Sequence, residues 1–137
     1  MRDREGLTLG QKARLAARIW ARFAHVVLDV RRESLPTLVE RLADANGRPP
    51  PHDRYRPATL SRAVDRSLRI GGRRPRCLLN ALVLFRLLRE QGEPAELVIG
   101  LLPEAPDQRA HAWVELAGRD VGPPPGRSGH EEMARLP

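Results

Sequence analysis

The sequence contains a single cysteine, Cys77, so no disulfide bond can form within the chain. Lysine is equally scarce, since Lys12 is the only one, and aromatic residues make up 4% of the chain. No apolar run reaches the roughly 18 residues that a membrane-spanning helix needs. The first residues, MRDREGLTLGQ, lack the apolar centre of a secretory signal peptide. Together these absences lead us to expect a soluble, cytoplasmic protein without a membrane span.

The length of 137 residues is enough for one domain with a modest core. Because aromatic residues are few, that core has to be built from leucine, valine, isoleucine and alanine. The net charge is +7 and is carried almost entirely by arginine. Such a charge favours acidic partners, but the arginine excess and the 13 prolines also fit a GC-rich genome. The charge by itself therefore indicates no function.

Apolar residues recur at helical spacing in four segments. We expect helices over about 9–31, after Ser34 up to a stop at Gly47, from an N-cap at Thr59 to Gly71-Gly72, and over 77–91 before Gly92. Thr8 and Gln11 have the spacing of a capping box for the first helix. A basic stripe of Arg14, Arg18 and Arg22 on that helix is interpreted as a solvated face, with a partner contact as the alternative.

The C-terminal part of the chain predicts three short strands. AELVIGLL (95–102) and the alternating AHAWVEL (110–116) are the first two, and RDVG returns after a tight Ala-Gly turn. The tail PPPGRSGHEEMARLP is expected to be a loop followed by one helical turn. Helices followed by strands predict an α+β fold, in which a small antiparallel sheet packs against the central helix that begins at Cys77.

A change in composition divides the chain. We expect a single domain over 1–137 with a helical N-terminal part (1–46), a proline-rich connection (47–58) and a catalytic core (59–137). The connection contains four prolines in GRPPPHDRYRP and is expected to run over the surface. No internal repeat is visible.

Cys77 is expected at the start of the central helix, where free backbone N–H groups and the helix dipole favour a thiolate. Arg73, Arg74 and Arg76 add positive charge immediately before it. The same N–H groups can hold the oxyanion of a tetrahedral intermediate. Cys77 is therefore a candidate nucleophile, and the alternative is a small core residue, which a lone cysteine usually is.

His111 lies in the alternating strand, where it shares one face with Trp113 and Glu115. The alanine, valine and leucine of the same strand occupy the other face, which we expect to meet the core. Three such side chains on one face indicate a binding site, with His111 as the base for a thiol nucleophile. A solvent-exposed polar row is the alternative. Trp113 is a candidate substrate-binding residue, with simple packing as its alternative.

Three segments share a pattern with a known family. They are C-L-x-x-A-L-x-L-x-x-L-L-R from Cys77, G-x-x-A-x-L-V-I-G from Gly92, and A-H-A-W-V-E from Ala110, with a glycine shortly beyond. Together they cover about Cys77 to Val121. The combination resembles the transglutaminase-like cysteine protease of lasso-peptide biosynthesis, the stand-alone leader peptidase that forms the protease half of the B-protein. The N-terminal helices match it only in general character.

The resemblance implies a transglutaminase/papain-like core and peptide-bond hydrolysis by a Cys-His-Asp triad, with Cys77 as nucleophile and His111 as base. It implies a ribosomally synthesised precursor peptide as substrate, cut between leader and core. It also implies a separate leader-recognition protein as partner, because this chain has no room for that domain, and a lasso cyclase acting next in the pathway. No cofactor is expected.

The third triad residue is the point at which this chain departs from the pattern. The resemblance places an aspartate about a dozen residues beyond the histidine, where this chain reads GPPPG. The nearest carboxylate beyond the turn is Asp120, which we predict to orient His111. A two-residue turn at Ala117-Gly118 pairs Asp120 with Glu115, and four strand residues of about 13 Å then separate it from His111. The alternatives are a Cys–His dyad, a carbonyl of GPPPG, or a carboxylate such as Asp107, Glu131 or Glu132. A second departure is Asn80, where members of the family more often carry a longer polar residue.

The remaining histidines, His25, His52 and His130, have no metal-site spacing relative to the cysteine, so we expect no metal. A second hypothesis, motivated by the missing aspartate, is a non-catalytic transglutaminase-like scaffold that binds a precursor peptide or partner protein. Nucleic-acid binding through the arginine stripe rests on charge alone and lacks a recognised module, so we expect no nucleic-acid partner.

Overall fold

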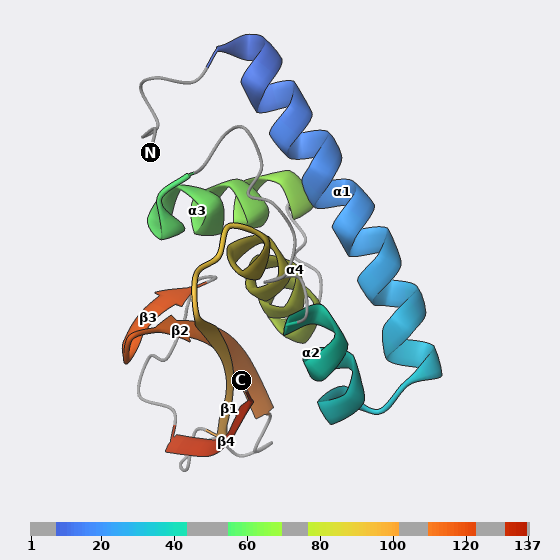
Figure 1. The fold of residues 1–137 in the computed structure, drawn as a ribbon, viewed down its shortest axis with the longest axis vertical. Coiled ribbons are helices and arrows are strands. Elements are labelled where there is room, and N and C mark those ends of the chain that lie inside the picture. Colours follow the sequence, from blue (N-terminus) through green and yellow to red (C-terminus); the bar gives the residue numbers. More distant parts are fainter. Residues whose placement is uncertain (1–7, 44–54, 70–76, 102–109, 123–130, 137) are drawn as a thin grey trace.

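The computed structural model of the protein describes residues 8–43, 55–69, 77–101, 110–122 and 131–136 (Figure 1). Within these ranges the elements are α1 (Leu9–Arg32), α2 (Leu35–Ala43), α3 (Pro57–Leu68), α4 (Cys77–Glu90), β1 (Ala95–Leu101), β2 (Ala110–Leu116), β3 (Arg119–Gly122) and β4 (Glu131–Leu136). Helices therefore precede an antiparallel sheet, and the predicted α+β fold is confirmed. None of the described helices is long and apolar enough to span a membrane.

The start of α1 has the capping box that the sequence predicted. The Gln11 backbone N–H donates to Thr8 Oγ1 at 3.1 Å, and the Thr8 N–H donates to Gln11 Oε1 at 2.9 Å. These two bonds satisfy backbone donors that have no helical acceptor. The helix buries Leu15, Ile19 and Val26, which lie on one side of it.

The predicted N-cap of α3 is wrong. The helix begins at Pro57, with Arg56 in the N-cap position and no side-chain capping bond, and Thr59 is buried in the first turn. A proline suits the first helical position because it has no N–H to satisfy and its φ is already helical. The predicted stops at Gly47 and Gly71-Gly72 lie outside the described residues, as does most of the connection 47–58.

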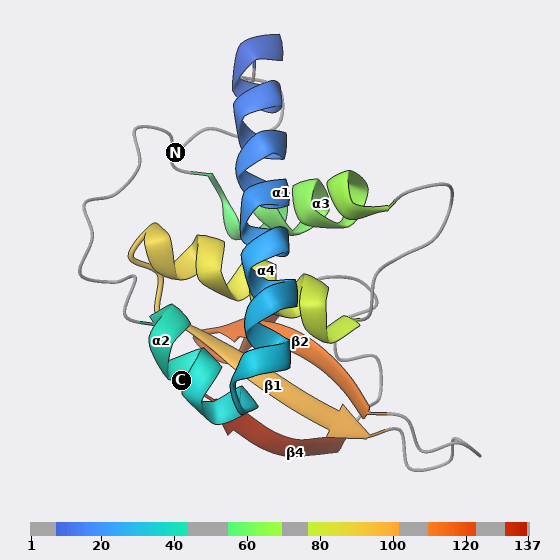
Figure 2. The ribbon, with the colours of Figure 1, turned by 90° about the vertical axis from the view of Figure 1, so that its right-hand side faces the viewer.

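The helix α4 is central, as its apolar sequence predicted. It contacts α1, α2 and α3, and it packs against β1 and β2 of the sheet (Figure 2). The five residues 81–85 are all completely buried, which fits a helical segment that is apolar on every side. Gly92 follows the end of the helix with a φ of 82°, a left-handed conformation that glycine adopts without strain.

The described strands form one antiparallel sheet in the order β3-β2-β1-β4. The β2–β3 hairpin turns at Ala117 and Gly118, whose φ angles are 53° and 77°. Two consecutive positive φ angles are typical of the type I′ turn that matches the twist of a hairpin. The two-residue turn predicted from Ala-Gly is therefore confirmed.

The helical turn predicted at the end of the chain is wrong. Residues 131–136 form β4, which pairs with β1 from Leu101 opposite Glu131 to Leu97 opposite Leu136. The sequence EEMARL consists of good helix formers, but a single helical turn buries little and satisfies few backbone groups. Pairing with the open edge of β1 satisfies the backbone of both strands, so tertiary contact outweighs local preference.

Candidate catalytic site

The helix α4 begins at Cys77, so the predicted position of the cysteine in the backbone is confirmed. This is the end of the helix at which backbone N–H groups lack acceptors and the dipole is positive. The Cys77 side chain and residues 73–76 lie outside the described part of the structure. In Figure 2, the beginning of α4 and the beginning of β2 lie at the same end of the molecule. The fold thus brings the cysteine end of α4 and the histidine end of β2 to one side.

His111 is the second residue of β2 and lies opposite Gly100 of β1. It is 9% exposed, and its imidazole stacks on the Trp113 indole with 5.9 Å between ring centroids and 30° between ring planes. The residue opposite His111, Gly100, has no side chain of its own to lie against the imidazole. His111 is therefore a buried histidine held on one side by an aromatic ring.

The face of β2 that carries His111 is buried. Trp113 is completely buried and Glu115 is 1% exposed, so the alternative of a solvent-exposed polar row is wrong. Ala112 and Val114 belong to the hydrophobic core on the other face, as predicted. The indole of Trp113 contacts His111 and donates from Nε1 to Glu115 Oε2 at 2.9 Å. Its contact with a substrate stays a prediction.

Glu115 is joined to the last strand by an ion pair. Its Oε1 accepts a hydrogen bond from Arg135 Nη2 at 2.9 Å. Arg135 also donates to Glu132 Oε1 at 2.6 Å and to Glu96 Oε1 at 3.2 Å. The hydrogen bonds to Glu132 and Glu115 raise the pKa of the Arg135 guanidinium above its usual value. One arginine of β4 thus links carboxylates from β1, β2 and β4.

Asp120 lies opposite Glu115, as the two-residue turn predicted. Its side chain is exposed, and its Oδ1 accepts a hydrogen bond from the Gly122 N–H at 2.8 Å. A bulge between Val114 and Glu115 shifts the register beyond this point. The distance along β2 from Glu115 to His111 is four residues, or about 13 Å. The role of Asp120 in orienting His111 stays a prediction, and the register does not favour it.

Among the alternative carboxylates in the described residues, Glu132 is the one that the register of the sheet places nearest to His111. It lies opposite Gly100, the same residue that lies opposite His111 on the other side. Two strand spacings of about 4.8 Å therefore separate the backbones of Glu132 and His111, with only a glycine between them. Asp107, the Glu131 side chain and most of the GPPPG segment lie outside the described residues.

Asn80 lies one helical turn after Cys77 and is 3% exposed. Within the part of the chain that the structure describes, its Oδ1 accepts no hydrogen bond. A buried amide oxygen of this kind requires an explanation, because burial without a partner costs free energy. In the sequence, this buried polar side chain is visible as an asparagine between apolar residues in CLLNALVLF, at a position where the chain departs from the family pattern.

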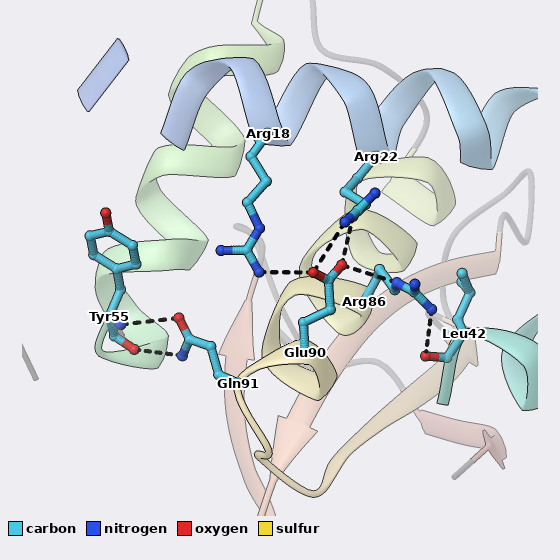
Figure 3. A network of polar contacts seen from close by, with 7 residues as sticks. All are labelled: Arg18, Arg22, Leu42, Tyr55, Arg86, Glu90 and Gln91. Carbon is cyan, nitrogen blue, oxygen red and sulfur yellow. Dashed lines mark hydrogen bonds and ion pairs between the residues drawn. The ribbon is translucent and has the colours of Figure 1, made fainter. Parts of the chain in front are cut away.

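The arginine stripe of α1 was interpreted as a solvated face, and this is wrong for Arg18 and Arg22, whereas Arg14 is exposed. Arg18 and Arg22 both donate to the Glu90 carboxylate of α4, and Arg86 donates to it from one turn earlier (Figure 3). Arg86 also donates to the Leu42 carbonyl of α2 at 3.2 Å. Burial by itself raises the pKa of Glu90, but the hydrogen bonds from Arg22 and Arg18 outweigh it and hold the pKa below its usual value. This cluster joins three helices and is structural.

A second polar contact ties the segment before α3 to the end of α4. Gln91 Oε1 accepts from the Tyr55 N–H at 3.0 Å, and Gln91 Nε2 donates to the Tyr55 carbonyl at 2.9 Å (Figure 3). Gln91 is 1% exposed, so its amide satisfies two backbone groups in the interior.

A surface groove of about 290 Å³ lies between α1 and α3. Its lining includes apolar Leu15 and Ala63 together with the cations Lys12, Arg62 and Arg66. The groove is formed by helix residues and includes no described residue of β2, so it is not part of the candidate catalytic site.

Within the described residues, no three side chains of His, Cys, Asp or Glu gather to hold a metal ion. His25 is exposed on α1. His52 and His130 lie outside the description.

Comparison with known proteins gives one match. Residues 13–135 match the family model described as the transglutaminase-like superfamily. This range includes both Cys77 and His111 and extends from α1 into β4. No curated protein and no solved structure matches the chain. The broad part of the resemblance seen in the sequence is thereby confirmed, and the narrower likeness to a lasso-peptide leader peptidase stays a prediction.

Proposed function

Because this chain belongs to the transglutaminase-like superfamily, which includes cysteine proteases, we propose that it is a cysteine peptidase with Cys77 as nucleophile and His111 as base. The observation that supports this proposal is the arrangement of the two elements. Cys77 is the first residue of α4, and α4 packs against the strand that carries His111. A helix N-terminus favours the thiolate of a cysteine, and a histidine on a strand packed against that helix is a candidate base for it.

In the proposed reaction, His111 takes the proton of Cys77 and the thiolate attacks the carbonyl carbon of the scissile peptide bond. Backbone N–H groups of the first turn of α4 stabilise the negative charge on the carbonyl oxygen. The imidazolium of His111 then protonates the leaving amine, and the C–N bond breaks to leave a thioester. Water, deprotonated by His111, hydrolyses the thioester and restores the thiol.

We propose further that the substrate is a ribosomally synthesised lasso-peptide precursor, from which the protein removes the leader. The three sequence patterns from Cys77 to Val121 support this narrower proposal. A separate recognition protein presents the leader, and a cyclase acts on the product.

The alternative is a scaffold that binds a precursor or partner without cutting it. It is favoured by the state of Asp120, whose exposed carboxylate is bonded to the Gly122 N–H. A protein of this kind needs neither the thiolate of Cys77 nor the imidazole of His111.

The deciding experiment incubates the protein with a lasso-peptide precursor and a leader-recognition protein, and reads the masses of the products. We expect one cut between leader and core, and no cut with Cys77→Ala or His111→Ala. Arg119→Ala, at an exposed position of β3, is the control and should cut normally. Cleavage that persists in Cys77→Ala would show that the nucleophile is assigned wrongly. Binding of the precursor without any cleavage by the unaltered protein would favour the scaffold.

A further inference from the structure

The buried face of β2 contains a charge that the proposed reaction does not use. Glu115 is 1% exposed, and a carboxylate at such a position is costly unless both of its oxygens are satisfied. They are satisfied by two different partners. Trp113 Nε1 donates to Oε2 at 2.9 Å, and Arg135 Nη2 donates to Oε1 at 2.9 Å. Held from both sides, the carboxylate is fixed in place.

The bond from Trp113 to Glu115 fixes the orientation of the indole. A tryptophan side chain has two rotatable bonds, and a hydrogen bond at its only donor restrains both. The other side of the same ring faces the imidazole of His111, at 5.9 Å between centroids and 30° between planes. The indole thus contacts Glu115 through its Nε1 and the imidazole of His111 through its ring.

The register of the sheet explains how the last strand takes part. Arg135 lies opposite Val98 of β1 and Glu115 lies opposite Glu96 of the same strand, so the bond from Arg135 to Glu115 spans β1 diagonally. Arg135 is itself held by Glu132 and Glu96. The contacts run from β4 through Glu115 and Trp113 to His111 without a break.

We propose that Glu115 is a positioning residue, which holds the Trp113 indole against the His111 imidazole, and that Arg135 of β4 holds Glu115 in turn. The proposal rests on the proposed function in that His111 is taken as the base. In this proposal the role of Trp113 is to contact the base, His111, rather than to contact the substrate. A well-packed apolar residue in place of a buried ion pair is often equally stable, so stability alone does not explain a charge here.

The test compares Trp113→Phe, Glu115→Gln and Glu115→Ala with Glu33→Gln. Trp113→Phe keeps a ring and removes the N–H donor, whereas Glu115→Gln keeps an acceptor for that donor and removes the charge. Glu33→Gln is the matched control, because Glu33 also accepts from an arginine, Arg41, but lies at the end of α1 and outside the contacts of the sheet. Thermal unfolding checks that each variant folds, and where Glu115→Ala does not fold, Trp113→Phe carries the test.

Two measurements are made on each variant. The first is the NMR spectrum of the imidazole carbons and protons of His111 in protein with labelled histidine. The second is kcat and KM for cleavage of the precursor peptide, over a range of pH. Loss of positioning lowers kcat, whereas a purely structural role leaves kcat of the folded fraction unchanged.

We expect Trp113→Phe and Glu115→Ala to shift and broaden the His111 resonances and to lower kcat by about tenfold to a hundredfold at unchanged KM, because small displacements of a reacting group slow catalysis. Glu115→Gln should lose less than Glu115→Ala, and Glu33→Gln should match the unaltered protein. Unchanged His111 resonances in the folded Trp113→Phe and Glu115→Ala variants, or an effect on KM alone, would overturn the proposal. If the unaltered protein cuts nothing, the proposed function fails, and the NMR comparison still decides whether Glu115 positions His111.

Discussion

Arg22 of α1 donates two hydrogen bonds to Glu90 of α4, at 2.6 and 3.2 Å, although the two residues lie 68 positions apart in the sequence (Figure 3). Arg18 and Arg86 complete the set of arginines around the same carboxylate. The Glu90 side chain is 10% exposed. One carboxylate thus neutralises part of a half-buried positive cluster and connects the first helix to the central one.

Replacing Glu90 removes the carboxylate that Arg18, Arg22 and Arg86 share within the described ranges of the chain. We expect Glu90→Gln to lower the free energy of unfolding by about 3 kcal/mol, because the remaining partners of a broken buried ion pair keep an uncompensated charge. Urea denaturation followed by circular dichroism measures the change. Glu33→Gln is the control, since Glu33 pairs with the exposed Arg41 and should cost less than about 1 kcal/mol. An equal decrease in the free energy of unfolding in the two variants would contradict a larger stabilising contribution from the Glu90 cluster.

Acidification should lower the free energy of unfolding through the same residue, Glu90. The folded-state pKa of Glu90 lies below its ordinary value of 4.5, so its contribution to stability is fully present above that value. The contribution is lost as the pH falls through the folded-state pKa, because protonation removes the charge that the arginines bind. We expect the difference in unfolding free energy between the unaltered protein and Glu90→Gln to be constant near neutral pH and to shrink below about pH 4. A difference that grows on acidification would show that the sign of the shift is wrong.

Cys77, the proposed nucleophile, is the first residue of α4. A helix N-terminus lowers the pKa of a thiol from its usual value of about 8.5, so more thiolate is present at neutral pH. We expect iodoacetamide to alkylate Cys77 at pH 7 faster than it alkylates free cysteine, as measured by mass spectrometry at timed intervals. His111→Ala should slow the reaction. A thiol that reacts only above pH 8 in both proteins would contradict the assigned nucleophile and base.

Asp120 and Glu132 differ in how far the register of the sheet places them from His111. We expect Asp120→Asn to lower kcat by less than about tenfold, because four strand residues of about 13 Å lie between it and the imidazole. A triad aspartate replaced by asparagine loses about 10⁴ in kcat in a well-known serine protease, so the two outcomes are far apart. Glu132→Gln, measured in the same assay, tests the carboxylate that lies across Gly100 from His111. A loss above a thousandfold in Asp120→Asn would restore Asp120 as the orienting residue.

Features set by neighbours along the chain were predicted correctly. The capping box of Thr8 and Gln11, the start of α4 at Cys77 and the two-residue turn at Ala117-Gly118 each depend on a few adjacent residues. The two-residue length of the turn also predicted correctly that Asp120 lies opposite Glu115. The core-facing positions Ala112 and Val114 followed from the period of two in a strand.

Predictions that needed a distant partner failed in a consistent way. The basic stripe of α1 gives no sign in the sequence that Glu90, far along the chain, will bind Arg18 and Arg22. EEMARL has the composition of a helix, and only the open edge of β1 makes it a strand. The burial of the polar face of β2 was not visible in the sequence either, so a solvent-exposed row stayed open there as the alternative to a binding site.

The sequence alone therefore determined which residues begin and end the central helix, which face of β2 carries His111, and which superfamily pattern the chain shares. Local conformational rules and a side-chain period act within a few residues, so they can be read directly. Only the tertiary structure decided that Glu115 is buried between Trp113 and Arg135, and that Glu90 gathers arginines from two helices. These contacts arise from packing that brings distant segments together, and a buried charge takes whichever partner that packing places within hydrogen-bonding distance.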